Sequence, residues 1–247
     1  MQKQYKELLI TDEMDIARAA KAQGRYVVLS YPVQGMTQED SLADYPYAIE
    51  TTEKDLEQAG YGTYLEHVLC RFRGIPCHIL DTERCRIREI TPGDVDRLYE
   101  IYADKQITKY MENLYENRED EIAYTKEYIR CHYGFYDFGM WIVEEKKTGH
   151  IIGRAGFDMR QGYEIPELGF MIARNKQRSG YAREVCEALL IYGKDQLGFE
   201  CVGAFTNPEN SAAIGLLSKL GFVYQQEKKT ESVKGDKETL VYYRKML

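Results

Sequence analysis

The stretch Gln177-Arg178-Ser179-Gly180-Tyr181-Ala182 joins an apolar run, residues 168–173, to a long amphipathic run, residues 183–197. This pattern predicts a strand, a tight turn and a helix. The glycine at position 180 lets a ligand approach the backbone closely, because it carries no Cβ. The amide hydrogens of residues 178–182 would point outward at the positive end of the helix dipole. The stretch therefore predicts an anion-binding turn.

Basic side chains gather around the predicted turn. They are Arg174, Lys176, Arg178 and Arg183. Such a cluster favours a ligand with several negative charges, such as a pyrophosphate. The alternative is an ordinary connection between a strand and a helix with a solvated basic face, and the turn alone does not decide between the two.

Three neighbouring segments favour the ligand-binding interpretation. They are residues 167–173 (Glu-Leu-Gly-Phe-Met-Ile-Ala), residues 207–211 (Asn-Pro-Glu-Asn-Ser) and residues 219–222 (Lys-Leu-Gly-Phe). In this order and spacing, the four motifs resemble the GNAT acetyltransferase superfamily, most of all the branch of ribosomal-protein N-terminal acetyltransferases. The resemblance covers about residues 84–247. It implies an α/β (α+β) fold with a central mixed, mostly antiparallel sheet flanked by helices.

The resemblance also implies an activity. An acyltransferase of this type moves an acetyl group from acetyl-CoA directly to a primary amine, which can be a protein N-terminus or a small-molecule amine. Acetyl-CoA would be a co-substrate, and no metal is needed. A second hypothesis is a non-catalytic CoA-binding sensor or regulatory protein.

The CoA contacts implied by the resemblance extend over both sides of the turn. Backbone groups of Met171 and Ile172 would pair with the pantetheine arm, and Asn207 and Asn210 would bind its amides. Asn210 is equally placed to cap the following helix. The full set of expected contacts is Met171, Ile172, Gln177, Arg178, Ser179, Gly180, Tyr181, Ala182, Asn207 and Asn210.

Glu167 places a carboxylate at the start of an otherwise apolar strand. In the family, an acid at this place removes a proton from the acceptor, because an alkylammonium with a pKa of about 10 has no lone pair. The resemblance therefore implies that Glu167 is the general base. The alternative is a glutamate that faces solvent or pairs with Arg154 or Arg160. Glu164 and Asp158 are second choices for the base.

Many family members carry a tyrosine seven residues after the asparagine that corresponds to Asn210, where it protonates the leaving thiolate. This chain has Leu217 at that position. Ser218, a tyrosine such as Tyr133, or water would then serve. No acid is needed if CoA leaves as the thiolate, which is a tolerable leaving group near neutral pH.

Residues 1–82 form a separate segment. Residues 8–11, 12–23 and 26–30 read as strand, helix and strand, which predicts a parallel pair with a right-handed crossover. The segment resembles the last β/α portion of haloacid-dehalogenase-like hydrolases, in which an acidic loop helps to hold magnesium. Asp12 and Asp15 stand near that place.

The segment lacks the Asp-x-Asp nucleophile strand of those hydrolases, which disfavours a magnesium-dependent phosphatase. We interpret Asp12 and Asp15 as a helix N-cap and a first-turn acid. The predicted organisation is a small, non-catalytic α/β module in residues 1–82, followed by an acetyltransferase domain in residues 83–247.

Composition narrows the possible partners. The net charge of -7 argues against nucleic acid as the main partner. Six cysteines without a Cys-x-x-Cys pair, and four histidines, make a zinc cluster unexpected. The sequence has no apolar run long enough to span a bilayer, so we expect no membrane partner and a cytoplasmic location. A homodimer is compatible with the sequence.

Overall fold

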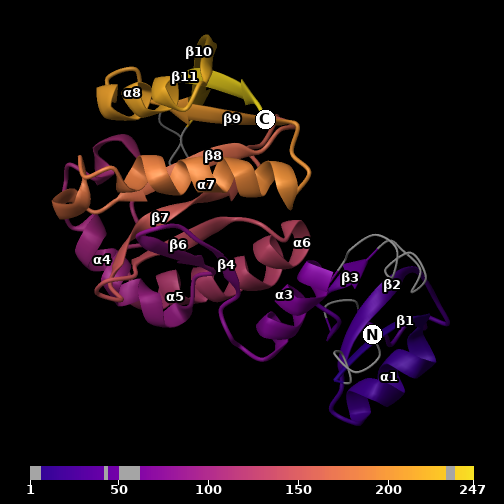
Figure 1. Cartoon of the computed structure of the whole chain (residues 1–247). Helices are drawn as coiled ribbons and strands as arrows, with labels where there is room; N and C mark the ends of the chain where they lie inside the picture. Colours follow the sequence, from indigo (N-terminus) through magenta and orange to yellow (C-terminus); the bar gives the residue numbers. More distant parts are fainter. Residues whose placement is uncertain (1–6, 42–43, 50–61, 232–236) are drawn as a thin grey trace. The chain divides into compact units, whose positions relative to one another are not determined.

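The computed structural model describes residues 7–41, 44–49, 62–231 and 237–247 (Figure 1). Contacts divide the chain into two compact units. The first unit contains Met1–Cys77 and Lys126–Asp137, and the second contains His78–Thr125 and Phe138–Leu247. The predicted boundary after residue 82 lies near the end of the first of these segments. No local sequence pattern predicts that residues 126–137 group with the front of the chain.

The first unit is a small parallel α/β module. Its elements before residue 77 are β1 (Leu8–Glu13), α1 (Met14–Ala22), β2 (Tyr26–Gln34), β3 (Ala48–Ile49) and α3 (Gly62–Phe72). The strand order is β1-β2-β3, and both pairs are parallel. The predicted parallel pair is therefore confirmed. Helix α1 buries Met14, Ala17 and Ala20, because these residues recur on one face of the helix.

Asp12 does not cap helix α1. It lies in β1, where its carboxylate accepts a hydrogen bond of 2.8 Å from the Gln34 side chain, and the N-cap residue is Glu13. The predicted N-cap role is therefore wrong, because the strand continues past Thr11 through an irregular register. Asp15 lies in the first turn as predicted and pairs with Arg18. Among the described residues, no cluster of acids, histidines or cysteines has the geometry of a metal site.

Residues 126–137 join the first unit through a buried ionic contact with α3. This segment contains the end of α5 (Arg118–Glu127), the π-helix η4 (Tyr128–Tyr133) and α6 (Gly134–Tyr136). The Asp137 carboxylate accepts hydrogen bonds from Arg71 Nη2 at 2.7 Å and contacts His67 Nδ1 at 3.1 Å. Burial, helped by the Asp137 charge, raises the pKa of Tyr64 to about 12. These contacts link positions far apart in the sequence.

The second unit is built on one eight-stranded sheet. Its strands are β4 (His78–Asp81), β5 (Cys85–Arg88), β6 (Met140–Glu145), β7 (Ile151–Asp158), β8 (Glu167–Ile172), β9 (Cys201–Thr206), β10 (Val223–Glu231) and β11 (Lys237–Met246). The order is β10-β11-β9-β8-β7-β6-β5-β4, and only β8 and β9 pair in parallel. This confirms the predicted mixed, mostly antiparallel sheet. Strand β4 was not predicted, because it is only 4 residues long and lies beside the expected boundary between the two domains.

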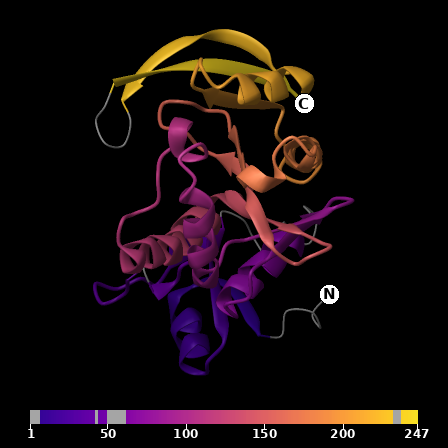
Figure 2. The ribbon, with the colours of Figure 1, turned by 90° about the vertical axis from the view of Figure 1, so that its left-hand side faces the viewer.

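Helices cover both faces of this sheet. Besides the first part of α5, they are α4 (Val95–Tyr102), α7 (Tyr181–Asp195) and α8 (Ser211–Lys219). Helix α7 lies along one face and is seen end-on in Figure 2. Tyr192 of α7 packs edge-on against Trp141, which also contacts Phe157. Leu168 lies opposite Phe157, so it shares the α7 face, and Glu167 lies on the other face.

No helix in the described part of the chain is both long enough and apolar enough to cross a membrane.

Candidate active site

Strands β8 and β9 pair at one position and then separate. Glu167 lies opposite Gly203, and the Gly203 amide donates to the Pro166 carbonyl at 2.8 Å. At the other end of β8, the Ala173 amide donates to the Ile152 carbonyl of β7 at 2.7 Å. Between these points the described chain has no further β8–β9 pair. The separation leaves a place where an extended ligand can lie against β8.

Alternation along β8 sets which backbone groups face this gap. The Pro166 carbonyl points to β9 and the Ala173 amide points to β7. The backbone groups of Ile172 therefore face the gap, and those of Met171 face β7, where Met171 lies opposite Arg154. Of the two backbone contacts expected for CoA, the geometry thus favours Ile172.

The predicted anion turn follows β8 directly. After the short 3-10 helix η5 (Arg174–Lys176), Arg178 has φ 57° and Gly180 has φ 85°, so both adopt left-handed conformations around Ser179. Gly180 is the N-cap residue of α7. This backbone reverses the chain within a few residues and begins a helix of 15 residues, which presents free amides at its N-terminus. The turn is exposed.

Gln177 and Tyr181 fasten the turn to the sheet. The Gln177 side-chain amide donates to the Ile172 carbonyl at 2.9 Å. The Tyr181 hydroxyl donates to Glu145, the last residue of β6. Both residues were expected as CoA contacts. In the structure, their side chains instead bond to the protein and hold the turn in position.

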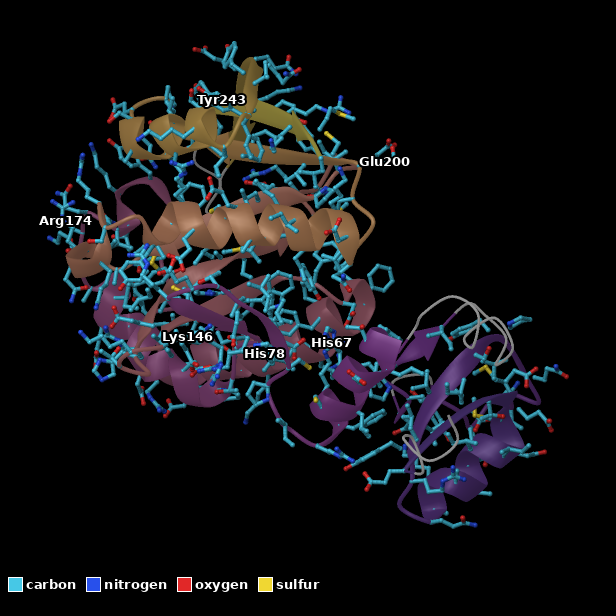
Figure 3. All side chains as sticks on the ribbon, viewed as in Figure 1. His67, His78, Lys146, Arg174, Glu200 and Tyr243 are labelled. Carbon is cyan, nitrogen blue, oxygen red and sulfur yellow. The ribbon has the colours of Figure 1, made fainter. Side chains whose placement is uncertain are left out.

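Acidic partners engage two of the four predicted basic side chains. Lys176 Nζ lies 2.8 Å from Glu145 Oε1, and Arg183 Nε lies 2.8 Å from Glu187. Arg174 and Arg178 have no acidic partner in the described part of the chain, and both are exposed. Figure 3 shows Arg174 at the edge of the second unit where α7 begins. No carboxylate within the described chain therefore competes with a ligand for these two side chains.

Glu145, which the sequence did not single out, supports the turn by binding Lys176 and Tyr181. Its side chain is only 7% exposed and also accepts a hydrogen bond from Thr148 at 2.7 Å. The hydrogen bond from Lys176, followed by those from Tyr181 and Thr148, lowers the pKa of Glu145 to about 2. A glutamate at the end of the apolar run 140–143 was the only signal in the sequence.

Arg84 supports the turn from the side and was also missed. It precedes β5, and its Nε lies 2.6 Å from Glu184 of α7. Burial alone would raise the pKa of Glu184, but hydrogen bonds from Thr82 and from Arg84 lower it. The guanidinium of Arg84 lies 4.2 Å from the centre of the Tyr181 ring. No motif in the sequence connects position 84 with the turn.

Glu167 lies at the opposite end of β8. Its side chain is 16% exposed and pairs with Arg160, whose Nε lies 2.6 Å from Oε2 and whose Nη2 lies 3.3 Å from Oε1. Burial raises the pKa of Glu167, although Arg160 and the Phe205 amide act in the opposite direction. Pairing with Arg160, one of the alternatives read from the sequence, is thus present. The role of general base stays a prediction.

The other candidate acids differ in their surroundings. Asp158 lies directly opposite Glu167 on β7, and its charge contributes to the raised pKa of Glu167. Glu164 is exposed in the connection between β7 and β8. Glu167 and Asp158 are therefore both half-buried, whereas Glu164 is exposed.

An aromatic cluster, which the sequence did not reveal, borders Glu167. The Arg160 guanidinium lies 4.6 Å from the centre of the Phe205 ring. Phe205 stacks on Tyr242 at 4.6 Å, and Tyr163 meets Phe205 edge-on at 4.8 Å. These residues come from β9, β11 and the connection before β8. Arg160 connects this cluster to the Glu167 carboxylate.

The asparagines after β9 stabilise the local backbone. Asn210 caps α8 by accepting from the Ala213 amide at 3.1 Å, and Asn207 accepts from the Glu209 amide at 2.9 Å. The N-cap alternative for Asn210 is confirmed. This role leaves its side-chain nitrogen available in principle for a ligand amide.

The position at which a tyrosine is common holds a core residue. Leu217 is 1% exposed in α8. Tyr133, a suggested substitute, is fully buried in the first unit. Ser218 is exposed. Of the side chains considered as proton donors, Ser218 alone is accessible to solvent.

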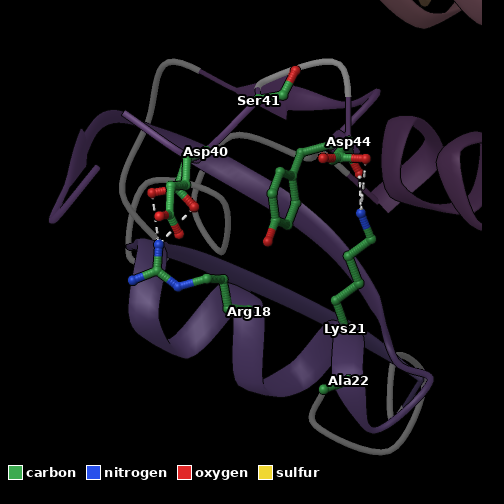
Figure 4. A pocket seen from close by; sticks show the side chains of 8 residues that line it. Arg18, Lys21, Ala22, Asp40, Ser41 and Asp44 are labelled. Atoms are coloured by element: carbon green, nitrogen blue, oxygen red, sulfur yellow. Dashed lines mark hydrogen bonds and ion pairs between the residues drawn. The ribbon is translucent and has the colours of Figure 1, made fainter. Parts of the chain in front are cut away.

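A groove in the first unit is lined by charges that pair with one another (Figure 4). Arg18 bonds to Asp40 at 2.6 Å, and Lys21 lies 3.3 Å from Asp44. The hydrogen bond from Arg18 lowers the pKa of Asp40 to about 2. Because these charges neutralise each other, the groove resembles a structural contact more than a binding site.

The sequence family described as "Acetyltransferase (GNAT) domain" matches residues 84–223. The chain belongs to the GNAT acetyltransferase family. The uncharacterized protein YkkB of Bacillus subtilis is 31% identical over 173 residues, which cover 67% of this chain and 95% of YkkB. The uncharacterized N-acetyltransferase YoaA of Bacillus subtilis is 30% identical over 147 residues, which cover 58% of this chain and 82% of YoaA.

Solved structures share the GNAT fold. A GNAT-family acetyltransferase from Bacillus anthracis aligns with a TM-score of 0.58 at 21% identity, over 68% of this chain and 97% of that chain. RimL, a ribosomal L7/L12 alpha-N-protein acetyltransferase, aligns with a TM-score of 0.61 at 14% identity, over 70% of this chain and 96% of its own. The family match begins at residue 84, so it gives no support to the haloacid-dehalogenase resemblance of the front segment.

Proposed function

We propose that this GNAT acetyltransferase moves the acetyl group of acetyl-CoA directly to a primary amine. One observation carries the proposal: the gap beside β8 runs from the exposed turn at the N-terminus of α7 to the partly buried carboxylate of Glu167. A ligand with phosphates at one end and a reactive acyl group at the other matches this arrangement.

The phosphates of acetyl-CoA would lie at the turn. The amides at the start of α7 and the exposed Arg174 and Arg178 supply positive potential there. The pantetheine arm would run along the gap and pair with the backbone of Ile172. A solved structure of RimL contains Coenzyme A, which supports a CoA site in this fold.

Glu167 would then remove the proton of the acceptor. The neutral amine nitrogen attacks the thioester carbonyl carbon, a C–N bond forms, and the C–S bond breaks as CoA leaves as its thiolate. Before the attack, Glu167 takes one proton from the acceptor ammonium and passes it to solvent. The nitrogen loses its second proton to the leaving thiolate or to solvent as the amide forms. Since burial raises the pKa of Glu167, its carboxylate is a better proton acceptor near neutral pH than an ordinary glutamate.

The names of similar proteins suggest which class of acceptor to test first. RimL acts on the N-terminus of a ribosomal protein, as its name states. A protein N-terminus is therefore the first acceptor to test, and small-molecule amines come second. We place the reaction in the cytoplasm, where acetyl-CoA and such acceptors are found together.

The test is an acceptor panel. Peptides with free N-termini, a lysine-containing peptide with a blocked N-terminus, polyamines and aminoglycosides are each mixed with acetyl-CoA, and thiol release and acetylated product are measured together. We expect equal amounts of thiol and acetylated amine with at least one acceptor class. Tight binding of acetyl-CoA without transfer to any of these amines would favour the non-catalytic CoA sensor.

A further inference from the structure

Arg84 lies outside the turn motif but is fixed against it. Its backbone amide and its Nε both donate to the Glu184 carboxylate, at 2.8 and 2.6 Å. Its Nη1 donates to the Ser179 carbonyl at 2.9 Å, and its guanidinium covers the Tyr181 ring. The side chain is held at three points and its backbone at a fourth, so the side chain has already lost most of its conformational freedom. It therefore loses little further entropy when a ligand binds.

The guanidinium of Arg84 still has donors to offer. A guanidinium carries five N–H groups. Within the described chain, only one N–H on Nε and one on Nη1 meet an acceptor. The side chain is 39% exposed, and Nη2 lies 3.3 Å from the position that a Cβ on Gly180 would take. The remaining N–H groups therefore lie beside the glycine that opens the turn to a ligand.

The chemistry of these donors suits a phosphomonoester. Parallel N–H groups of a guanidinium match two oxygens of a phosphate, and the interaction strengthens with the charge of the anion. The turn amides, Arg174 and Arg178 are the groups that we assign to the pyrophosphate. Besides its pyrophosphate, CoA carries one phosphomonoester, on the ribose of its nucleotide. Arg84 supplies a further cation, which comes from the segment before β5 and not from the turn itself.

We propose that Arg84 binds the ribose phosphomonoester of CoA and so makes the enzyme prefer acetyl-CoA over acetyl-dephospho-CoA. This inference rests on the proposed binding of acetyl-CoA at the turn. It makes Arg84 a residue that determines cofactor specificity, in addition to holding the start of α7.

A pair of variants distinguishes binding of the phosphomonoester by Arg84 from its structural role at the start of α7. Arg84→Gln removes the guanidinium and its ion pair, whereas Glu184→Gln weakens the same ion pair but keeps the guanidinium. Both are titrated with acetyl-CoA and with acetyl-dephospho-CoA by calorimetry, after thermal unfolding has shown that they are folded. Arg84→Lys keeps the positive charge but lacks the parallel N–H donors of the guanidinium. It replaces Arg84→Gln if that variant does not fold.

The wild-type protein is expected to bind acetyl-CoA roughly tenfold or more tightly than acetyl-dephospho-CoA. Arg84→Gln should lose most of this preference while still binding acetyl-dephospho-CoA, and Glu184→Gln should keep it. Arg84→Lys should retain part of it. An absent preference in the wild type, or an equal loss for both ligands in Arg84→Gln, would overturn the specificity role. Neither result would affect the proposed acetyl transfer, whereas a wild type that binds neither ligand would contradict both.

Discussion

The two ends of β8 present opposite environments. Beyond Ile172 the chain forms an exposed turn, with left-handed residues at Arg178 and Gly180 and cations around them. At the other end, Glu167 is enclosed by Arg160 and by a cluster of aromatic rings. The first end relies on backbone conformation and the second on side chains from distant segments. We infer that the first end binds the cofactor and the second conducts the proton transfer.

The largest expected effect concerns the enclosed end. Glu167→Gln keeps the size of the side chain but removes its basicity, so turnover should fall by about 10²-fold or more. Steady-state kinetics at saturating acetyl-CoA measure this loss. Glu164→Gln is the matched control, because Glu164 is exposed nearby and should leave turnover almost unchanged. Normal turnover in Glu167→Gln would show that another group acts as the base.

The next effect concerns the exposed end. Gly180→Val forces a β-branched residue into a conformation with φ 85°, and its Cβ would meet Arg84 Nη2 at 3.3 Å. A left-handed conformation costs a residue with a Cβ on the order of 1–2 kcal/mol, so acetyl-CoA affinity should fall roughly tenfold or more. Gly198→Val is the control, since Gly198 has φ 69°, no neighbour within 4 Å, and lies beyond the other end of α7. Equal affinities for both variants would argue against the turn as the anion site.

A smaller and more specific effect is expected at Arg160. This residue lowers the pKa of Glu167, against the effect of burial. In Arg160→Gln the pKa of Glu167 should therefore rise further. The limb of the pH–rate profile that reflects deprotonation of the base should move to higher pH. An unchanged limb would mean that the titration in the profile does not belong to Glu167.

The smallest effect is expected at Glu145, below the turn. Its pKa is lowered to about 2 from an ordinary value of 4.5, so its contacts stabilise the folded protein fully above about pH 4.5 and progressively less toward pH 2. Glu145→Gln should lower the melting temperature by a few degrees at neutral pH, and the difference from the wild type should shrink as the pH falls through this window. Glu187→Gln, at an exposed pair, is the control. A difference that does not depend on pH would assign the stabilisation to packing.

The end of β8 that leads into the turn could be predicted from the sequence. The strand, the turn and α7 are contiguous, and their signals are local: an apolar run, a glycine and an amphipathic helix. The order of the motifs predicted the sheet as well. Strand β4 was not predicted because its 4 residues are too few to show an alternating pattern, and its pairing with β5 becomes visible only in the fold.

The partners of the site residues could not be predicted in the same way. Arg84 and Glu184 are far apart in the sequence, as are Lys176 and Glu145. The grouping of residues 126–137 with the first unit depends on contacts with α3, which no local pattern encodes. Glu167 was proposed from a motif, but its pairing with Arg160 remained one of several alternatives until the fold brought the two together.

If the two ends of β8 perform separate tasks, a single titration will distinguish them. Acetyl-CoA is titrated calorimetrically into Glu167→Gln and Gly180→Val beside the wild type. We expect Glu167→Gln to bind acetyl-CoA with nearly wild-type affinity and Gly180→Val to bind it roughly tenfold or more weakly. A loss of affinity in Glu167→Gln as large as that in Gly180→Val would contradict the separation of cofactor binding from proton transfer.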